Sequence, residues 1–99
     1  MSKLVWTAPA VSDLEAIYDF IANDSEYYAS SFIEELIQQP EKLLEFPKIG
    51  RIVPEYNRMD IRELIFQSYR IIYQITDDRI TILTVIHGKR DLLIVYSEI

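Results

Sequence analysis

Three β-rich segments with very short connections occupy the second half of the chain and restrict its fold more than any other feature. They cover residues 61–66, 69–75 and 80–87. Gln67 and Ser68 join the first pair, and residues 76–79 join the second pair. Connections of this length are typical of β-hairpins. The sequence therefore predicts a three-stranded antiparallel meander.

The first half predicts a short strand followed by two helices. A β-prone run at residues 4–7 ends at Ala8 and Pro9, and proline suits the first turn of a helix. Apolar residues then recur at helical spacing over residues 10–23, and again over residues 28–46 after a turn that offers an N-cap. Pro40 removes one amide from the second stripe, so we expect that helix to kink or restart near Gln39.

The predicted fold class is α+β: a short N-terminal strand, a two-helix hairpin and a three-stranded antiparallel meander, with the helices on one face of the sheet. A chain of 99 residues is long enough for one small domain, expected to span residues 1–99. Tyr18, Phe32, Phe46 and Tyr73 are expected in the core, and residues 47–60 in a loop. The apolar residues 92–96 fit an edge strand, a packed tail or a partner-binding segment.

Charge and composition exclude several classes of function. The net charge is −6, and residues 1–47 hold nine of the sixteen acids against two of the ten cations. A protein this acidic is a poor general binder of DNA or RNA, although the second half leaves room for a small cationic patch. The lack of cysteine removes disulfides and zinc-finger spacings, and neither a metal site nor a cofactor is suggested. Neither a signal-like N-terminus nor a run of about 20 apolar residues is found, so we expect a cytoplasmic protein without membrane contact.

Arg70 stands out because it places a cation inside an otherwise apolar strand. Alternation along the strand puts Arg70 on the face of Ile72 and Gln74, opposite Tyr69 and Tyr73. Arginine is costly to bury unpaired. This face is therefore paired with a carboxylate, open to water, or turned toward an anionic or polar partner.

Three residues offer chemistry that an active site could use, namely proton transfer or the binding of an anion. His87 is a candidate for proton transfer, because histidine exchanges protons near neutral pH, but a histidine at a strand end also serves to hydrogen-bond a turn. Arg70 and Arg90 can clamp a phosphate, or can pair with Glu63 or Asp91 within the fold.

Other candidates are a tyrosine and three further cations. Tyr96 can stack on a base or pin the tail to the sheet. Arg51, Arg62 and Lys89 are candidate binding residues. Arg62 and Glu63 are neighbours on a strand and should point to opposite faces.

Taken together, these segments resemble the RelE/ParE superfamily of toxins from bacterial type II toxin-antitoxin operons. The likeness covers nearly the whole chain. It rests on the helical residues 13–21, the turn Glu45-Phe46-Pro47-x-x-Gly50-Arg51, Arg62-Glu63-Leu64, the strand at 69–73 and the stretch at 87–92.

The resemblance implies a RelE/ParE-like fold and a toxin held inactive by a cognate antitoxin. ParE-like members, which include plasmid stabilization proteins, act on DNA gyrase, and RelE-like members cut mRNA in the ribosomal A site. The helical half and the stretch at 87–91 are more similar to the ParE side. By contrast, Arg70, Arg90 and Tyr96 fall where RelE-like nucleases place functional arginines and a tyrosine. RelE-like nucleases also have lysines on the strand before the one that carries Arg70, and in this chain those positions are Ile61 and Glu63.

The resemblance leads to three hypotheses. The first is a ParE-like toxin that inhibits growth by binding gyrase, without enzymatic activity or cofactor. The second is a RelE-like ribosome-dependent endoribonuclease that uses Arg70 and Arg90, assisted by His87 or Tyr96. The third is a degenerate toxin that only binds its antitoxin. In each case the antitoxin would supply operator binding, and a homodimer or a heterotetramer with antitoxin is compatible with the resemblance.

Overall fold

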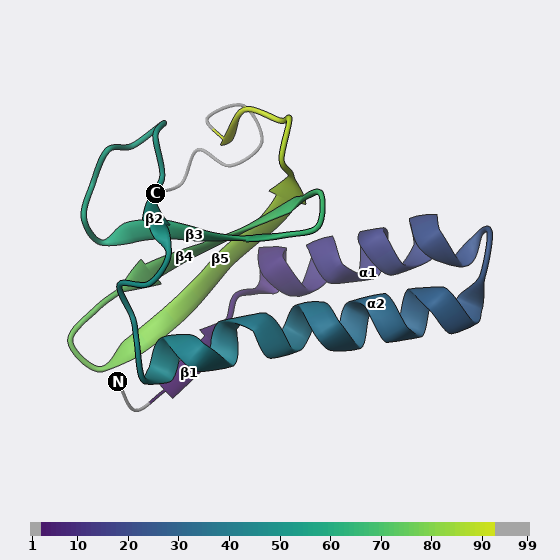
Figure 1. Cartoon of the computed structure of the whole chain (residues 1–99), viewed down its shortest axis with the longest axis horizontal. Coiled ribbons are helices and arrows are strands. Elements are labelled where there is room, and N and C mark those ends of the chain that lie inside the picture. Colours follow the sequence, from purple (N-terminus) through teal and green to yellow (C-terminus); the bar gives the residue numbers. More distant parts are fainter. Residues whose placement is uncertain (1–2, 93–99) are drawn as a thin grey trace.

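The computed structural model describes residues 3–92. Its elements follow the order β1 (Lys3–Trp6), α1 (Ala8–Ala22), α2 (Glu26–Gln38), the 3₁₀ helix η1 (Gln39–Leu44), β2 (Arg51–Ile52), β3 (Ile61–Phe66), β4 (Tyr69–Ile75) and β5 (Arg79–His87) (Figure 1). The strands form one sheet in the order β1-β5-β4-β3-β2. The predicted α+β class is confirmed, including the N-terminal strand, the helix hairpin and the antiparallel meander.

Two features of the sheet were not predicted. β1 pairs in parallel with β5, with Leu4 opposite Ile80, so the N-terminal strand lies at one edge of the sheet. The prediction of a continuous loop over residues 47–60 was wrong, because Arg51 and Ile52 form the opposite edge strand β2 against β3. A strand of two residues is too short to show an alternating pattern.

Local sequence signals account for the helix boundaries. The Thr7 hydroxyl accepts the amide of Ala10 at the start of α1, and the Ser25 hydroxyl accepts the amide of Tyr28 at the start of α2. α2 ends at Gln38, and the 3₁₀ helix with Pro40 in its first turn continues the chain. This is the restart that Pro40 predicted. Between residues 3 and 92, no helix has the length and apolar character needed to cross a membrane.

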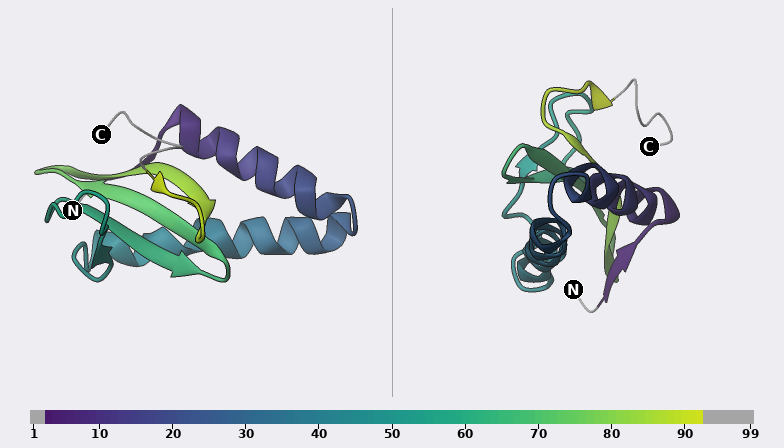
Figure 2. Two further views of the ribbon diagram at one scale, coloured as in Figure 1. Left: turned by 90° about the horizontal axis from the view of Figure 1, so that it is seen from above. Right: turned by 90° about the vertical axis from the view of Figure 1, so that its right-hand side faces the viewer.

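The sheet carries an apolar core on each face. The larger one lies between the sheet and the helices and includes Leu14, Phe32 and Leu36 from the helices, with Ile71 and Ile82 from the sheet. Both helices cover that face, and their connection extends beyond the sheet (Figures 1 and 2). A smaller core on the other face consists of Val53, Ile61, Ile72, Leu83, Ile86 and Leu92. The loop after β2 and the segment after β5 lie on that side, away from the helices (Figure 1).

A β-bulge in β5 ties the sheet to α1. The β4–β5 register shifts between Ile72 and Tyr73, which leaves Leu83 without a partner in the ladder. The Thr7 hydroxyl donates to the Leu83 carbonyl at 2.9 Å. Asp13, on α1, accepts the Val85 amide at 2.9 Å and the Thr84 hydroxyl. The two side chains thus satisfy backbone groups that the bulge releases.

The turn before β2 packs around one buried tyrosine. The Tyr73 hydroxyl donates to the Pro47 carbonyl at 2.8 Å and accepts the Gly50 amide at 3.0 Å. Burial raises the pKa of Tyr73, which keeps this hydroxyl protonated. The core assignments of Phe32 and Tyr73 are confirmed, whereas Tyr18 is half-buried and Phe46 was wrongly assigned, since it is 55% exposed. Phe46 is exposed because it follows η1, where the helical spacing that predicted its burial has ended.

Candidate functional site

Arg70 lies at the centre of a charged cluster on the sheet face opposite the helices. Its Nε donates to Glu63 Oε1 on β3 at 2.6 Å. Its Nη1 and Nη2 donate to the two carboxylate oxygens of Glu55, each at 2.8 Å. Arg51, on β2, pairs with the other oxygen of Glu63. Of the alternatives open to this face, the structure therefore shows pairing with carboxylates, and it adds Glu55 to the expected partner Glu63.

The cluster is buried except at its outer end. The side chains of Glu63 and Arg70 are 0% and 6% exposed, and that of Glu55 is 17% exposed, whereas that of Arg51 is 62% exposed. Hydrogen bonding to Arg70 lowers the pKa of Glu55 to about 2, and the same pairing raises the pKa of Arg70. Both groups are therefore charged at any physiological pH.

The cluster also holds the chain that follows β5. Arg70 Nη1 donates to the Arg90 carbonyl at 3.2 Å, and the Leu92 amide donates to Glu55 Oε2 at 3.1 Å. The Leu92 side chain is fully buried in the smaller core. Residues 90–92 are thereby held against the face of the sheet on which Arg70 lies.

The exposed candidate residues lie at the end of β5 and directly after it. His87, Lys89 and Arg90 are all exposed. His87 Nδ1 accepts the Lys89 amide at 3.3 Å, and its ring lies edge-on to Tyr69 with centroids 5.7 Å apart. His87 thus makes the turn contact that a structural histidine would make. Two exposed cationic side chains, Lys89 and Arg90, follow it.

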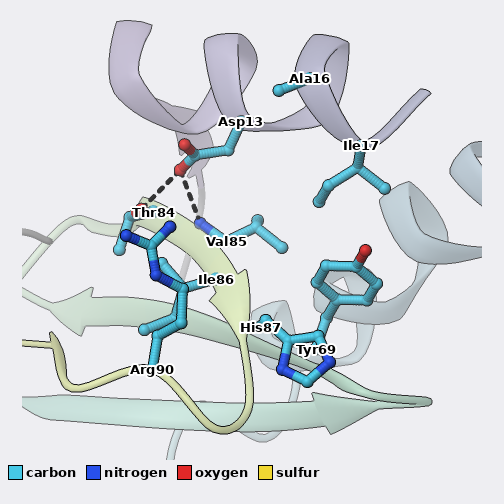
Figure 3. A pocket seen from close by; sticks show the side chains of 9 residues that line it. All are labelled: Asp13, Ala16, Ile17, Tyr69, Thr84, Val85, Ile86, His87 and Arg90. Atoms are coloured by element: carbon cyan, nitrogen blue, oxygen red, sulfur yellow. Dashed lines mark hydrogen bonds between the residues drawn. The ribbon is translucent and has the colours of Figure 1, made fainter. Parts of the chain in front are cut away.

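Two pockets meet at His87. One, of about 410 Å³, lies between α1 and β5 and is lined by Asp13, Tyr69, His87 and Arg90 among others (Figure 3). The other, of about 260 Å³, is lined by Arg51, Arg70, His87 and Lys89 among others. The structure therefore brings Arg51, Arg70, His87, Lys89 and Arg90 to the same end of the sheet.

Arg62 lies apart from that group and has a different environment. It is 8% exposed, and its guanidinium donates to the carbonyls of Met59, Lys48 and Gly50 at 2.9, 3.2 and 3.0 Å. These bonds hold the turn before β2 and the loop before β3 together. Tyr96 lies outside the described residues.

Sequence reasoning missed two acidic residues. Glu55 lies in a breaker-rich loop, where no periodicity links it to Arg70 fifteen residues later. Asp13 lies on a helix whose spacing gives no sign of its role, because the bulge that it completes has no signature in the sequence. Within residues 3–92, no group of three or more His, Cys, Asp or Glu side chains is arranged to hold a metal ion.

Comparisons with known proteins agree with this architecture. The family model described as the ParE toxin of the type II toxin-antitoxin system parDE matches residues 4–92. The toxin RelE2 of Caulobacter vibrioides is 32% identical over 91 residues, which cover 91% of this chain and 99% of the relative. A solved structure described as the chromosomal ParDE toxin-antitoxin system from P. aeruginosa has a similar fold, with a TM-score of 0.74 and 23% identity, covering 90% of this chain and 98% of that one. The chain belongs to the ParE toxin family of type II toxin-antitoxin systems.

Proposed function

We propose that this chain inhibits bacterial growth by binding a protein target, without cutting RNA. By its resemblance to ParE-like toxins, the target is DNA gyrase. The chain acts in the cytoplasm as a single domain and needs no cofactor. One observation carries the proposal: the arginine best placed to hold a phosphate already has two carboxylate partners.

The contacts of Arg70 argue against phosphate binding in the resting protein. Its Nε, Nη1 and Nη2 all donate to Glu55 or Glu63 at 2.6–2.8 Å. A ribonuclease needs uncompensated positive charge where phosphate charge develops. Here Glu63 stands where the nuclease branch has a lysine, and it supplies charge of the opposite sign within the cluster.

Membership in this family also supports a cognate antitoxin as partner. A groove of about 420 Å³ between α1 and α2 is lined by Val11, Leu14, Tyr18, Ile33 and Ile37, with Glu15 and Asp19 at its margin. An antitoxin segment with apolar residues at helical spacing would fit such a groove. If the product of a neighbouring open reading frame fails to co-purify with the chain, this partner is excluded.

A ribosome-dependent endoribonuclease is the second candidate, and one observation favours it. His87, Lys89 and Arg90 are exposed, and Arg90 and Lys89 each line one of the two pockets that His87 borders, as proton transfer and phosphate binding would require. A degenerate toxin that binds only its antitoxin is the third candidate, and it would not arrest growth.

Induced expression in a bacterial host, with transcript 5′ ends mapped shortly after induction, separates the three. The proposal expects growth arrest with intact transcripts. New codon-phased ends, together with loss of killing in Arg90→Ala, would establish the nuclease. Arg79→Ala is the matched control, because Arg79 is a partly exposed arginine at the opposite end of β5. Normal growth would favour the degenerate toxin.

A further inference from the structure

The two terminal nitrogens of Arg70 form one edge of its guanidinium, and the Glu55 carboxylate bonds to both of them, while Nη1 also donates to the Arg90 carbonyl at 3.2 Å. Nη1 and Nη2 each contact one oxygen of Glu55 at 2.8 Å. This is the paired geometry with which arginine also binds phosphate and other oxyanions. Glu63 contacts Nε and leaves the outer edge to Glu55.

Both segments that close over this edge lie outside the regular strands. Glu55 belongs to the loop between β2 and β3, and Arg90 and Leu92 follow the end of β5. The Arg90 carbonyl and the Leu92 amide are bonded to Arg70 and Glu55, respectively. The cover is therefore made of residues outside the strands, and one of its contacts, that of the Leu92 amide, depends on the Glu55 carboxylate.

The charges of the cluster indicate which kind of ligand would bind to Arg70 if Glu55 were removed. Arg51 and Arg70 carry two positive charges, and Glu55 and Glu63 carry two negative ones. Without Glu55 the cluster has a net charge of +1, beside an Arg70 side chain that is 6% exposed when Glu55 is in place. A buried charge without its partner is unfavourable, so an anion from solution is expected to bind there.

We infer that the outer edge of Arg70 is a masked oxyanion site, and that the Glu55 carboxylate is its internal ligand. A phosphate group, or another anion with two oxygens at similar spacing, competes with Glu55 for Nη1 and Nη2. Displacement of Glu55 also removes the acceptor of the Leu92 amide. Anion binding and the attachment of residues 90–92 are therefore coupled, and each weakens the other.

In the intact protein the internal carboxylate is the stronger competitor. An intramolecular ligand acts at an effective concentration of about a millimolar or more, and Glu55 is additionally placed by the loop that carries it. The wild-type chain is thus expected to show no specific response to millimolar phosphate. The site becomes accessible when Glu55 is removed or when its loop is drawn away.

Glu55→Ala tests the inference with inorganic phosphate as the probe. The substitution frees the Arg70 edge and leaves space for one anion. We expect about 20 mM phosphate to raise the Tm of this variant by about 7 °C over chloride at equal ionic strength, as a phosphate concentration about ten times the Kd would do. Asp60→Ala is the matched control, since it removes a carboxylate from another arginine pair that is partly exposed. The control and the wild type should show no such rise.

Three results would overturn the inference. The first is a folded Glu55→Ala variant with no greater response to phosphate than Asp60→Ala. The second is an equal response in the double variant Glu55→Ala/Arg70→Gln, which lacks the guanidinium. The third applies if Glu55→Ala is unfolded in chloride. Phosphate should then restore the circular dichroism of the folded protein, and a variant that stays unfolded in phosphate would overturn the inference. These assays use no growth or gyrase readout, so they do not depend on the proposed function.

Discussion

Asp13 joins α1 to the bulge of β5, and its removal should destabilise the protein strongly. Its carboxylate accepts the Val85 amide at 2.9 Å and the Thr84 hydroxyl. Thr84 and Val85 are each 3% exposed, and both line the pocket between α1 and β5, so water can replace the lost acceptor only from that pocket. Leaving a buried donor without an acceptor costs about 1–3 kcal/mol. Two donors lose their acceptor, and relaxation of the structure recovers part of this cost. We therefore expect Asp13→Ala to lower the free energy of unfolding by about 2–4 kcal/mol.

Urea denaturation followed by circular dichroism measures this change. Asp13→Asn keeps one acceptor oxygen and should lose less than half as much. Asp19→Ala, an exposed carboxylate on the same helix, controls for the general effect of removing a charge from α1. If Asp13→Ala lies within about 0.5 kcal/mol of the wild type, the size of an ordinary surface effect, the coupling between α1 and the bulge would be refuted.

Three further changes test other parts of the structure. In Gly50→Ala, the added Cβ would lie 2.5 Å from the Tyr73 hydroxyl and 2.6 Å from the Glu63 carbonyl oxygen, so we expect a loss of about 1–3 kcal/mol by urea denaturation. The lowered pKa of Glu55 stabilises the fold by up to about 3 kcal/mol above pH 4.5. This contribution should be lost as the pH falls from 4.5 toward 2. When the free energy of unfolding is measured across that range, Glu55→Gln should show a smaller loss. Arg70→Ala leaves two largely buried carboxylates without their shared partner and should lower the unfolding free energy by about 3–5 kcal/mol, whereas an unchanged urea midpoint would contradict the pairing.

The elements with periodic sequence were predictable. The meander followed from three β-rich runs with short connections, and the helices followed from apolar spacing together with Pro9 in the first turn of one and the capping turn before the other. Pairing of Arg70 with Glu63 was one of the alternatives, and the strand register shows why it forms: Glu63 lies opposite Ile72, which shares a face with Arg70. In each case the deciding interaction is local or follows from the pattern of a single strand.

The rest depends on contacts between segments far apart in the chain. Glu55 reaches Arg70 from an irregular loop, and Asp13 reaches a bulge more than seventy residues later. Phe46 shows the opposite error, because helical spacing continued in the sequence after the helix itself had ended. Loop conformation and strand bulges leave no periodic signal, so these contacts could not be read from the chain.

The target is tested most directly by adding the purified chain to DNA gyrase and relaxed plasmid and measuring supercoiling. The proposed function expects inhibition that rises with the concentration of the chain and is relieved by the co-purified antitoxin. Full supercoiling at excess of a folded chain that arrests growth in cells would contradict it. Cleavage of ribosome-bound mRNA by that same preparation would then identify the chain as a nuclease.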